Sequence, residues 1–214
     1  MASTVIHMAV ASEINKKLKR DNKKLLIGSI APDISKQIGE TKRLSHFLDD
    51  DDTNIPNIER FLYKYKNKLT DDFVMGYFVH LYTDYLWFKY FIPDIKDKDL
   101  ITKLDGTVVK CYDGMFDQYV YNDYTNLNVR LFDEYDMDLS IFYNEVPAMD
   151  NIIEEIPYDK LQVILDRASV IIENSKVRKE FVFNMDNIKT FVKTSTDLIL
   201  GKIEEIGELN GKLN

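Results

Sequence analysis

The chain has 214 residues, a formal net charge of −8 and a pI near 5.0. This acidic balance argues against broad electrostatic capture of nucleic acid, so an anionic substrate would need a local cation such as a bound metal. Hydrophobic residues make up 45% of the chain against only 8 Gly and 5 Pro, which favours a globular protein of long helices over a sandwich or barrel.

The first predicted helix begins after Ser3 or Thr4, either of which can cap it, and runs to about Arg20. The starting stretch MASTVIHMAV lacks the basic start and the long apolar run of a signal peptide, and no segment offers the ~18 apolar residues of a membrane span. We therefore expect a cytoplasmic protein. The stretch LLIGSIAPDISK predicts a short apolar element followed by a turn, and Pro32 disfavours helix at Ala31.

An acidic loop and a second helix follow. The run DDDDTN at residues 49–54 lacks the alternating spacing of a calcium loop and is expected to be solvated. Asn54 and Pro56 are expected to open the helix NIPNIERFLYKYKNKL, with proline near its first turn.

The most apolar predicted helix comes next. Thr70 or Asp71 is expected to cap it, and it should run to about Phe91 and end before Pro93. Because this helix is apolar on most sides, we expect it at the centre of the fold.

The rest of the chain is expected to be helical after one irregular stretch. Residues 94–111 are the least regular part, with a turn at Asp105-Gly106. Strand alternation is not convincing anywhere, so we predict an all-α fold in a single domain spanning residues 1–214. The further helices are expected at about Met115–Asp136, Leu139–Tyr143, Tyr158–Asn174 and Met185–Glu208.

The three histidines and two aspartates suggest a metal centre. The histidines are His7, His46 and His80, and none follows His80. Asp84 lies four residues after His80, which places both side chains on one helix face, and Asp33 lies in a rigid turn after a proline. Imidazole and carboxylate ligands together suit Zn²⁺, with Fe²⁺ or Mn²⁺ as alternatives. The single cysteine of the chain excludes a multi-thiolate site and an intramolecular disulfide.

Each of these residues also has a plain structural interpretation. His80 on an apolar helix can be a core residue with Asp84 as its hydrogen-bonded partner, and Asp33 can be a turn residue or a helix cap. Aromatic residues on the same segment can contact substrate, but at helical spacing they are usually core: Tyr77, Tyr82 and Trp87.

Four stretches, taken in order, resemble the zinc-dependent phospholipase C family, which shares its all-helical fold with the S1/P1-type nucleases. They cover about residues 1–90 and are HMAVA at His7, GSIAPDI ending at Ile34, Ser45-His46-Phe47, and GYFVHLYTDYLW from Gly76 to Trp87. The resemblance implies this fold and a zinc cluster.

The resemblance also implies particular ligands. The residues matching Asp33, His46, His80 and Asp84 would ligate one zinc. The residue matching Asp84 would bridge to a second zinc, held by the residue matching His7 and by the mature N-terminal amine and carbonyl. Independently of the resemblance, the chemistry of such a site leads us to expect that Asp33 also acts as a base that takes a proton from the attacking water.

The sequence departs from that family in two ways. The secreted members hold a third zinc with two later histidines and a glutamate, but no histidine follows His80 here. Carboxylates for rebuilding such a site are Asp113, Asp117 and Asp123, although surface carboxylates on a helix are the commoner finding. The secreted members also begin with a tryptophan, whereas this chain begins Met1-Ala2-Ser3.

The expected function is a metal-dependent hydrolase of phosphoric esters, with phospholipase C-like cleavage of a phosphodiester by metal-activated water. The substrate would be a small phosphoester or a phospholipid head group, without stable nucleic-acid binding. The alternatives are a non-catalytic metal-binding helical domain with an incomplete cluster and a plain helical interaction module without metal. An HD-type phosphohydrolase needs an adjacent His-Asp pair, which the chain lacks.

Overall fold

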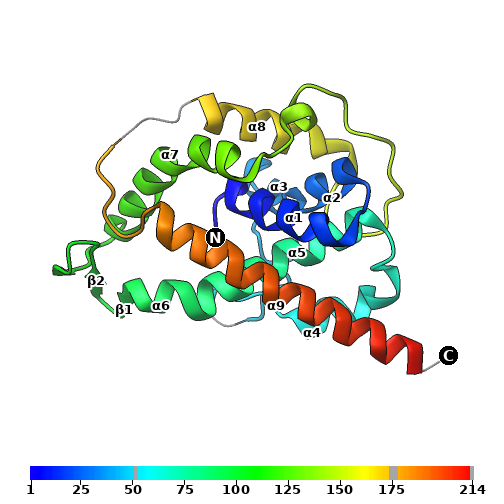
Figure 1. Ribbon diagram of the computed structural model, residues 1–214, viewed down its shortest axis with the longest axis horizontal. Coiled ribbons are helices and arrows are strands. Elements are labelled where there is room, and N and C mark those ends of the chain that lie inside the picture. Colours follow the sequence, from blue (N-terminus) through cyan, green and yellow to red (C-terminus); the bar gives the residue numbers. More distant parts are fainter. Residues whose placement is uncertain (51–52, 174–177, 213–214) are drawn as a thin grey trace.

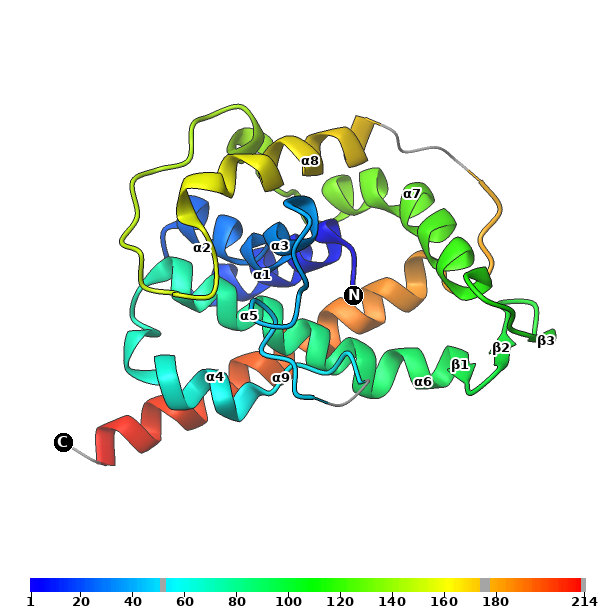
Figure 2. The ribbon, with the colours of Figure 1, turned by 180° about the vertical axis from the view of Figure 1, so that it is seen from behind.

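The computed structural model describes residues 1–50, 53–173 and 178–212, and helices dominate it (Figure 1). Helix α1 (Thr4–Leu18) packs against α2 (Asn22–Gly28), α5 (Asp72–Leu86), α7 (Met115–Tyr135) and α9 (Met185–Lys212), and α2 packs closely along α5. On the opposite face, shown in Figure 2, the short α3 (Ile34–Gln37) lies against α8 (Leu161–Glu173).

Polar caps fix where the helices begin. Ser3 accepts a hydrogen bond from the Ile6 N–H at the start of α1, and Asp71 accepts one from Val74 at the start of α5. Both residues were among the expected caps. Helix α4 (Ile58–Tyr65) begins later than expected, because the side chain of Asn57 caps it while Pro56 forms a β-bridge with Leu48.

Two prolines lie inside helical turns, contrary to expectation. After α5, the chain continues through a π-helix (Trp87–Phe91) into α6 (Ile92–Ile95), so the helical segment does not end before Pro93. Likewise Ala31–Asp33 is a 3-10 turn with Pro32 in it. In both cases proline occupies the first turn of a new helical segment, where its missing N–H costs nothing.

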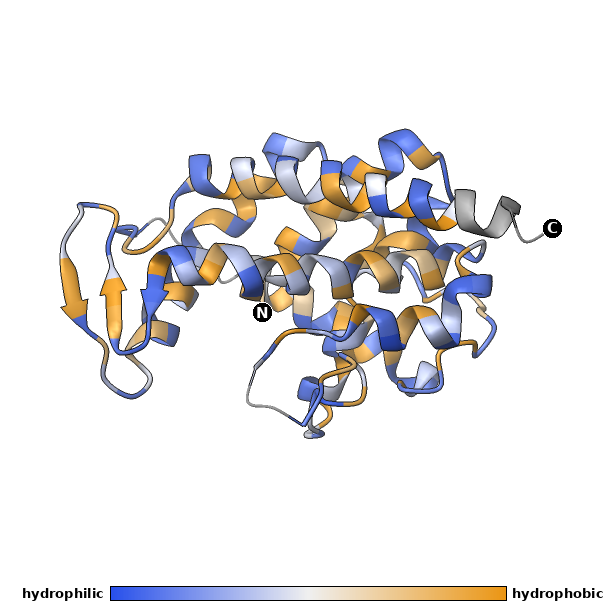
Figure 3. Cartoon of the chain, turned by 90° about the horizontal axis from the view of Figure 1, so that it is seen from below, coloured by the Kyte–Doolittle hydropathy of each residue, from blue (hydrophilic) through white to orange (hydrophobic). Residues whose placement is uncertain are grey.

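The stretch expected to be irregular, residues 94–111, contains a small antiparallel sheet, so the fold is mostly helical and agrees roughly with the predicted all-α class. Ile101 at its centre is buried and pairs with Lys96 on one side and Val109 on the other. Strands this short cannot show an alternating pattern. The sheet projects at one end of the molecule (Figure 3) and consists of β1 (Lys96–Asp97), β2 (Leu100–Thr102) and β3 (Val108–Lys110).

The C-terminal helices lie close to their expected positions. The expected helix at Leu139–Tyr143 is a 3-10 turn (Leu139–Phe142), another 3-10 turn (Tyr158–Lys160) leads into α8, and α9 continues beyond its predicted end. Asn174 of the expected helix and positions 51 and 52 of the acidic run fall outside the described residues. Along the part of the chain that the structure describes, no helix is both long and apolar enough to cross a membrane.

Candidate metal centre

The structure brings all five predicted ligand residues together at the centre of the helical core. His7 comes from α1, Asp33 from the 3-10 turn before α3, and His46 from the loop before α4, whereas His80 and Asp84 come from α5. Their exposed fractions are 5% or less. Burying five ionisable side chains in a core is costly unless they are paired, hydrogen-bonded or bound to a metal ion.

The five residues form two groups that share His80. One group is Asp33, His46 and His80, and the other is His7, His80 and Asp84. Within each group the three ligand atoms lie within 4.8 Å of one another. Buried His and Asp groups in this arrangement can hold a metal ion.

Asp84 faces both groups with different oxygens. Its Oδ1 lies 3.4 Å from His7 Nε2, and its Oδ2 lies 3.8 Å from His46 Nε2 and 3.8 Å from His80 Nε2. The other close approaches are 3.4 Å between His46 Nε2 and Asp33 Oδ1, and 3.2 Å between the Nε2 atoms of His46 and His80. This is the placement that a carboxylate bridging two ions would require.

Several of these atoms are buried without a hydrogen-bond partner. Among the described residues, both ring nitrogens of His7, Oδ1 of Asp33 and Oδ2 of Asp84 lack one. Leaving a buried polar atom unsatisfied costs about 1–3 kcal/mol, and more for charged groups. Four such atoms in one cluster, all of types that ligate metals, fit a bound cation.

The backbone orients two of the imidazoles. His80 Nδ1 lies 2.7 Å from the Ser29 carbonyl oxygen, and His46 Nδ1 lies 3.2 Å from the Lys42 carbonyl oxygen and 3.0 Å from Ser45 Oγ. Because a carbonyl oxygen only accepts, Nδ1 donates in each case and the Nε2 lone pair points into the cluster. Metal-binding histidines are typically held by such an outer hydrogen bond.

Protonation states in the centre suit metal binding as well. Burial, reinforced by the neighbouring charge of His7, lowers the pKa of His80 from 6.5 to about 3, so this ring is neutral at physiological pH. Burial alone would raise the pKa of Asp33 and Asp84, but the adjacent histidines outweigh it and the pKa of both carboxyls falls below the usual range. Metal ligation requires these forms, neutral imidazole and ionised carboxylate.

The start of the chain lies against the same cluster. The Ala2 N–H donates a hydrogen bond to Asp84 Oδ1 at 3.0 Å, and the Tyr124 hydroxyl donates one to the Met1 carbonyl at 2.6 Å. Burial lowers the pKa of the Met1 amine. Tyr124 on α7 is a residue that the sequence did not single out, because nothing in its local context indicates contact with residue 1.

A cavity of about 850 Å³ opens beside the centre. Asp33 is the one ligand residue among those lining it, and the Met1 and Ala2 end of the chain also borders it. Three cationic side chains line its wall: Lys36, Lys42 and Arg167. The cavity therefore gives a solute access to the Asp33 side of the cluster.

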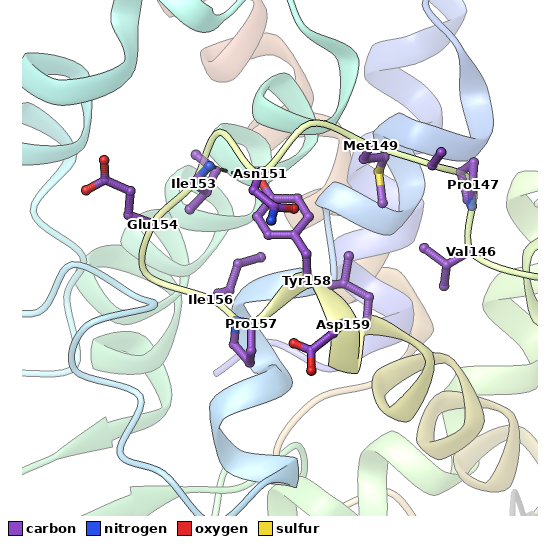
Figure 4. Close-up of a pocket in the computed structure, with 12 residues that line it drawn as sticks. Val146, Pro147, Met149, Asn151, Ile153, Glu154, Ile156, Pro157, Tyr158 and Asp159 are labelled. Carbon is purple, nitrogen blue, oxygen red and sulfur yellow. Dashed lines mark hydrogen bonds between the residues drawn. The ribbon is translucent and has the colours of Figure 1, made fainter.

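A second hollow, of about 820 Å³, lies elsewhere and contains none of the five residues. It is formed by the loop from Val146 to Leu161, with Met149, Ile153 and Tyr158 around it (Figure 4). No histidine or cysteine lines it, so it offers no metal chemistry of the kind found in the core.

The carboxylates considered for a third metal are placed differently. Asp123 is buried, and its two oxygens accept hydrogen bonds from the backbone N–H groups of Phe181, Val182 and Phe183 at 2.8–3.1 Å. It therefore anchors the segment before α9, while Asp113 and Asp117 are exposed. Within the described ranges, no third group of metal-binding side chains is present.

The aromatic residues near the centre are mainly core. Tyr77 and Trp87 are buried, at 0% and 1% exposed, and the Tyr77 hydroxyl donates to the Ser45 carbonyl next to His46. Tyr82 is partly buried and packs against the same core. The core interpretation is confirmed for Tyr77 and Trp87, and Tyr82 lies at the edge of the core.

No family model, curated protein or solved structure matches this chain. The fold and the site together define a mostly helical protein whose core contains histidine and aspartate groups able to hold a metal ion. Any more specific identification depends on the chemistry of that site.

Proposed function

We propose that the protein is a zinc-dependent hydrolase of phosphoric esters with a fold like that of the zinc-dependent phospholipases C and the S1/P1-type nucleases. The observation that carries the proposal is the convergence of five buried ligand-type residues, with four unpartnered atoms, beside a cavity with cationic walls. Bound metal ions can activate water and stabilise the oxygens of a phosphoester during hydrolysis, and a cationic entrance attracts an anionic substrate.

The ligand set favours zinc. Imidazole nitrogens and carboxylate oxygens are typical zinc donors, with iron or manganese as the nearest substitutes. Asp33, His46, His80 and Asp84 would hold the first ion, and His7 with the other oxygen of Asp84 would hold a second. When bound with an open position, zinc lowers the pKa of coordinated water to about 7 and so supplies hydroxide at neutral pH.

The protein's own residues would position the substrate and move protons. Asp33 borders the cavity and is ionised, so it would orient the attacking water and accept its proton. Lys42 is half-buried on the same wall, where it would bind a phosphate oxygen. The cavity volume is in the range of sites for small molecules, which favours a small phosphoester or a lipid head group as the substrate.

Metal analysis followed by an assay tests this proposal. Protein purified without added metal should carry at least one zinc per chain and hydrolyse bis(p-nitrophenyl) phosphate. Asp33→Asn should lose most of this activity, whereas Asp94→Asn, an exposed aspartate beyond α5, should keep it. Zinc without hydrolysis of any phosphoester would indicate a non-catalytic metal-binding domain, and protein free of metal would overturn the proposal.

A further inference from the structure

The cavity beside the metal centre has more positive charge on its wall than the chain as a whole would suggest. The protein has a net charge of −8, yet Lys36, Lys42 and Arg167 all line this one cavity. Among the described residues, none of the three forms an ion pair with a carboxylate. Some cations elsewhere on the surface do form such pairs, for example Arg60 with Asp49.

The three cations come from different elements and occupy two sides of the cavity. Lys42 precedes His46, and its ammonium lies 5.4 Å from the centre of the Phe88 ring. Lys36 comes from α3 and donates a hydrogen bond of 2.9 Å to the Tyr121 hydroxyl of α7.

Arg167 comes from α8, which packs against both α3 and α7 (Figure 2). Lys36 and Arg167 therefore lie on the side of the cavity formed by α3, α7 and α8. Lys42 lies on the other side, next to the metal centre.

Charge balance limits what such a cavity can hold. Two divalent ions would outweigh the two carboxylates Asp33 and Asp84, so a loaded centre already attracts one phosphate. A phosphodiester has a single negative charge, which the centre and Lys42 can neutralise. Lys36 and Arg167 would then remain without an ion-pair partner among the described residues, since the one further carboxylate on the wall, the exposed Asp117, forms no ion pair with either.

We propose that the substrate has a second anionic group beyond the scissile phosphate, and that Lys36 and Arg167 bind this group between α3, α7 and α8. This inference rests on the proposed function and specifies its substrate class, a phosphoester with a terminal phosphate or carboxylate. The bond to the Tyr121 hydroxyl holds the Lys36 ammonium in place and leaves its other protons for the ligand. The planar guanidinium of Arg167 can bind either anion through two parallel hydrogen bonds.

Binding measurements test this inference without depending on hydrolysis. The zinc-loaded protein is titrated by calorimetry with bisphosphates of propane-, pentane- and heptane-diol, and with the matching hydroxyalkyl phosphates that lack the second group. At least one bisphosphate should bind about tenfold more tightly than its partner, as expected for a charge-assisted contact. Carboxyalkyl phosphates of the same lengths distinguish a terminal carboxylate from a terminal phosphate.

Matched variants locate the effect. Lys36→Gln and Arg167→Gln should each reduce the ratio of bisphosphate affinity to hydroxyalkyl phosphate affinity at least threefold. Lys36→Arg should retain this preference. Lys68→Gln, an exposed lysine outside the cavity, should leave it unchanged. The inference is overturned if no spacer length gives a preference, or if the two variants keep it. A preference that persists in a protein without hydrolytic activity would refute the proposed function but support this binding site.

Discussion

Replacing Asp84 by Asn tests whether one carboxylate serves two ions. Asp84 Oδ1 faces His7 Nε2 at 3.4 Å, and Oδ2 faces the Nε2 atoms of His46 and His80 at 3.8 Å each. Asparagine has nearly the same shape but only one oxygen, so its NH₂ group must face one of the two groups. An NH₂ group cannot ligate a metal, and the remaining oxygen is neutral.

The expected loss of affinity follows from these contacts. Removing even an outer-shell partner of a metal typically costs about 10–100-fold in affinity, and Asp84 would be a direct ligand on both sides. We therefore expect a loss of at least about 100-fold, or ~2.7 kcal/mol, at each site. His7→Ala should differ, because His7 belongs to only one of the two groups.

The assay is the number of metal ions per chain after dialysis against a graded chelator. The wild type should hold two ions, His7→Ala one, and Asp84→Asn none at chelator levels that the wild type withstands. Asp94→Asn removes one negative charge outside the cluster and is the control. The bridging assignment fails if the wild type never holds more than one ion, or if His7→Ala keeps both.

Three further predictions concern stability. The pKa of His80 is about 3 in the folded protein, against an ordinary value of 6.5. As pH falls, the unfolded chain therefore takes up the proton first, which favours unfolding. The free energy of unfolding of the metal-free protein should be highest above pH 6.5 and should fall by about 2 kcal/mol by pH 5, at about 1.36 kcal/mol per pH unit. Urea unfolding at pH 7.5 and 5.0 measures this, and an equal pH dependence in His80→Gln would contradict it. Gly76→Ala should prevent or severely weaken folding, since a Cβ there would lie 2.1 Å from the Leu25 carbonyl oxygen. Gly201→Ala is the control, because a Cβ there meets no atom within 4 Å, and its melting temperature should equal that of the wild type. Asp123→Ala should lower the free energy of unfolding by about 2–4 kcal/mol, because three backbone N–H groups lose their acceptor; a urea midpoint equal to that of the wild type would refute the anchoring role.

The sequence predicted the parts of the site that depend on local spacing. His80 and Asp84 are four residues apart, so any helix through them places both on one face. The caps Ser3 and Asp71 were also predictable, since short polar side chains before apolar runs have a defined role. That these residues actually bind zinc stays a prediction.

Features that depend on tertiary contacts were not predictable. Tyr124, Lys36 and Arg167 reach the site from helices whose packing no local pattern specifies. The small sheet was missed because strands of two or three residues gain their stability from pairing rather than from their own sequence. The helical segment was expected to end before Pro93, but it continues past this residue. A π-helix precedes Pro93 and a new α-helix begins there, and proline is well tolerated in the first turn of a helix.

A pair of glycines links the fold to the geometry of the site. Gly28 on α2 faces the Phe73 carbonyl of α5, and Gly76 on α5 faces the Leu25 carbonyl of α2, so a Cβ on either glycine would lie within 2.2 Å of a carbonyl oxygen. This close crossing brings the Ser29 carbonyl within 2.7 Å of His80 Nδ1, one turn beyond Gly76. The crossing thereby fixes the orientation of His80 and, through the turn that follows Ser29, the position of Asp33 opposite it. The placement of His80 and Asp33 relative to each other therefore depends on Gly28 and Gly76 as well as on the two ligand residues themselves.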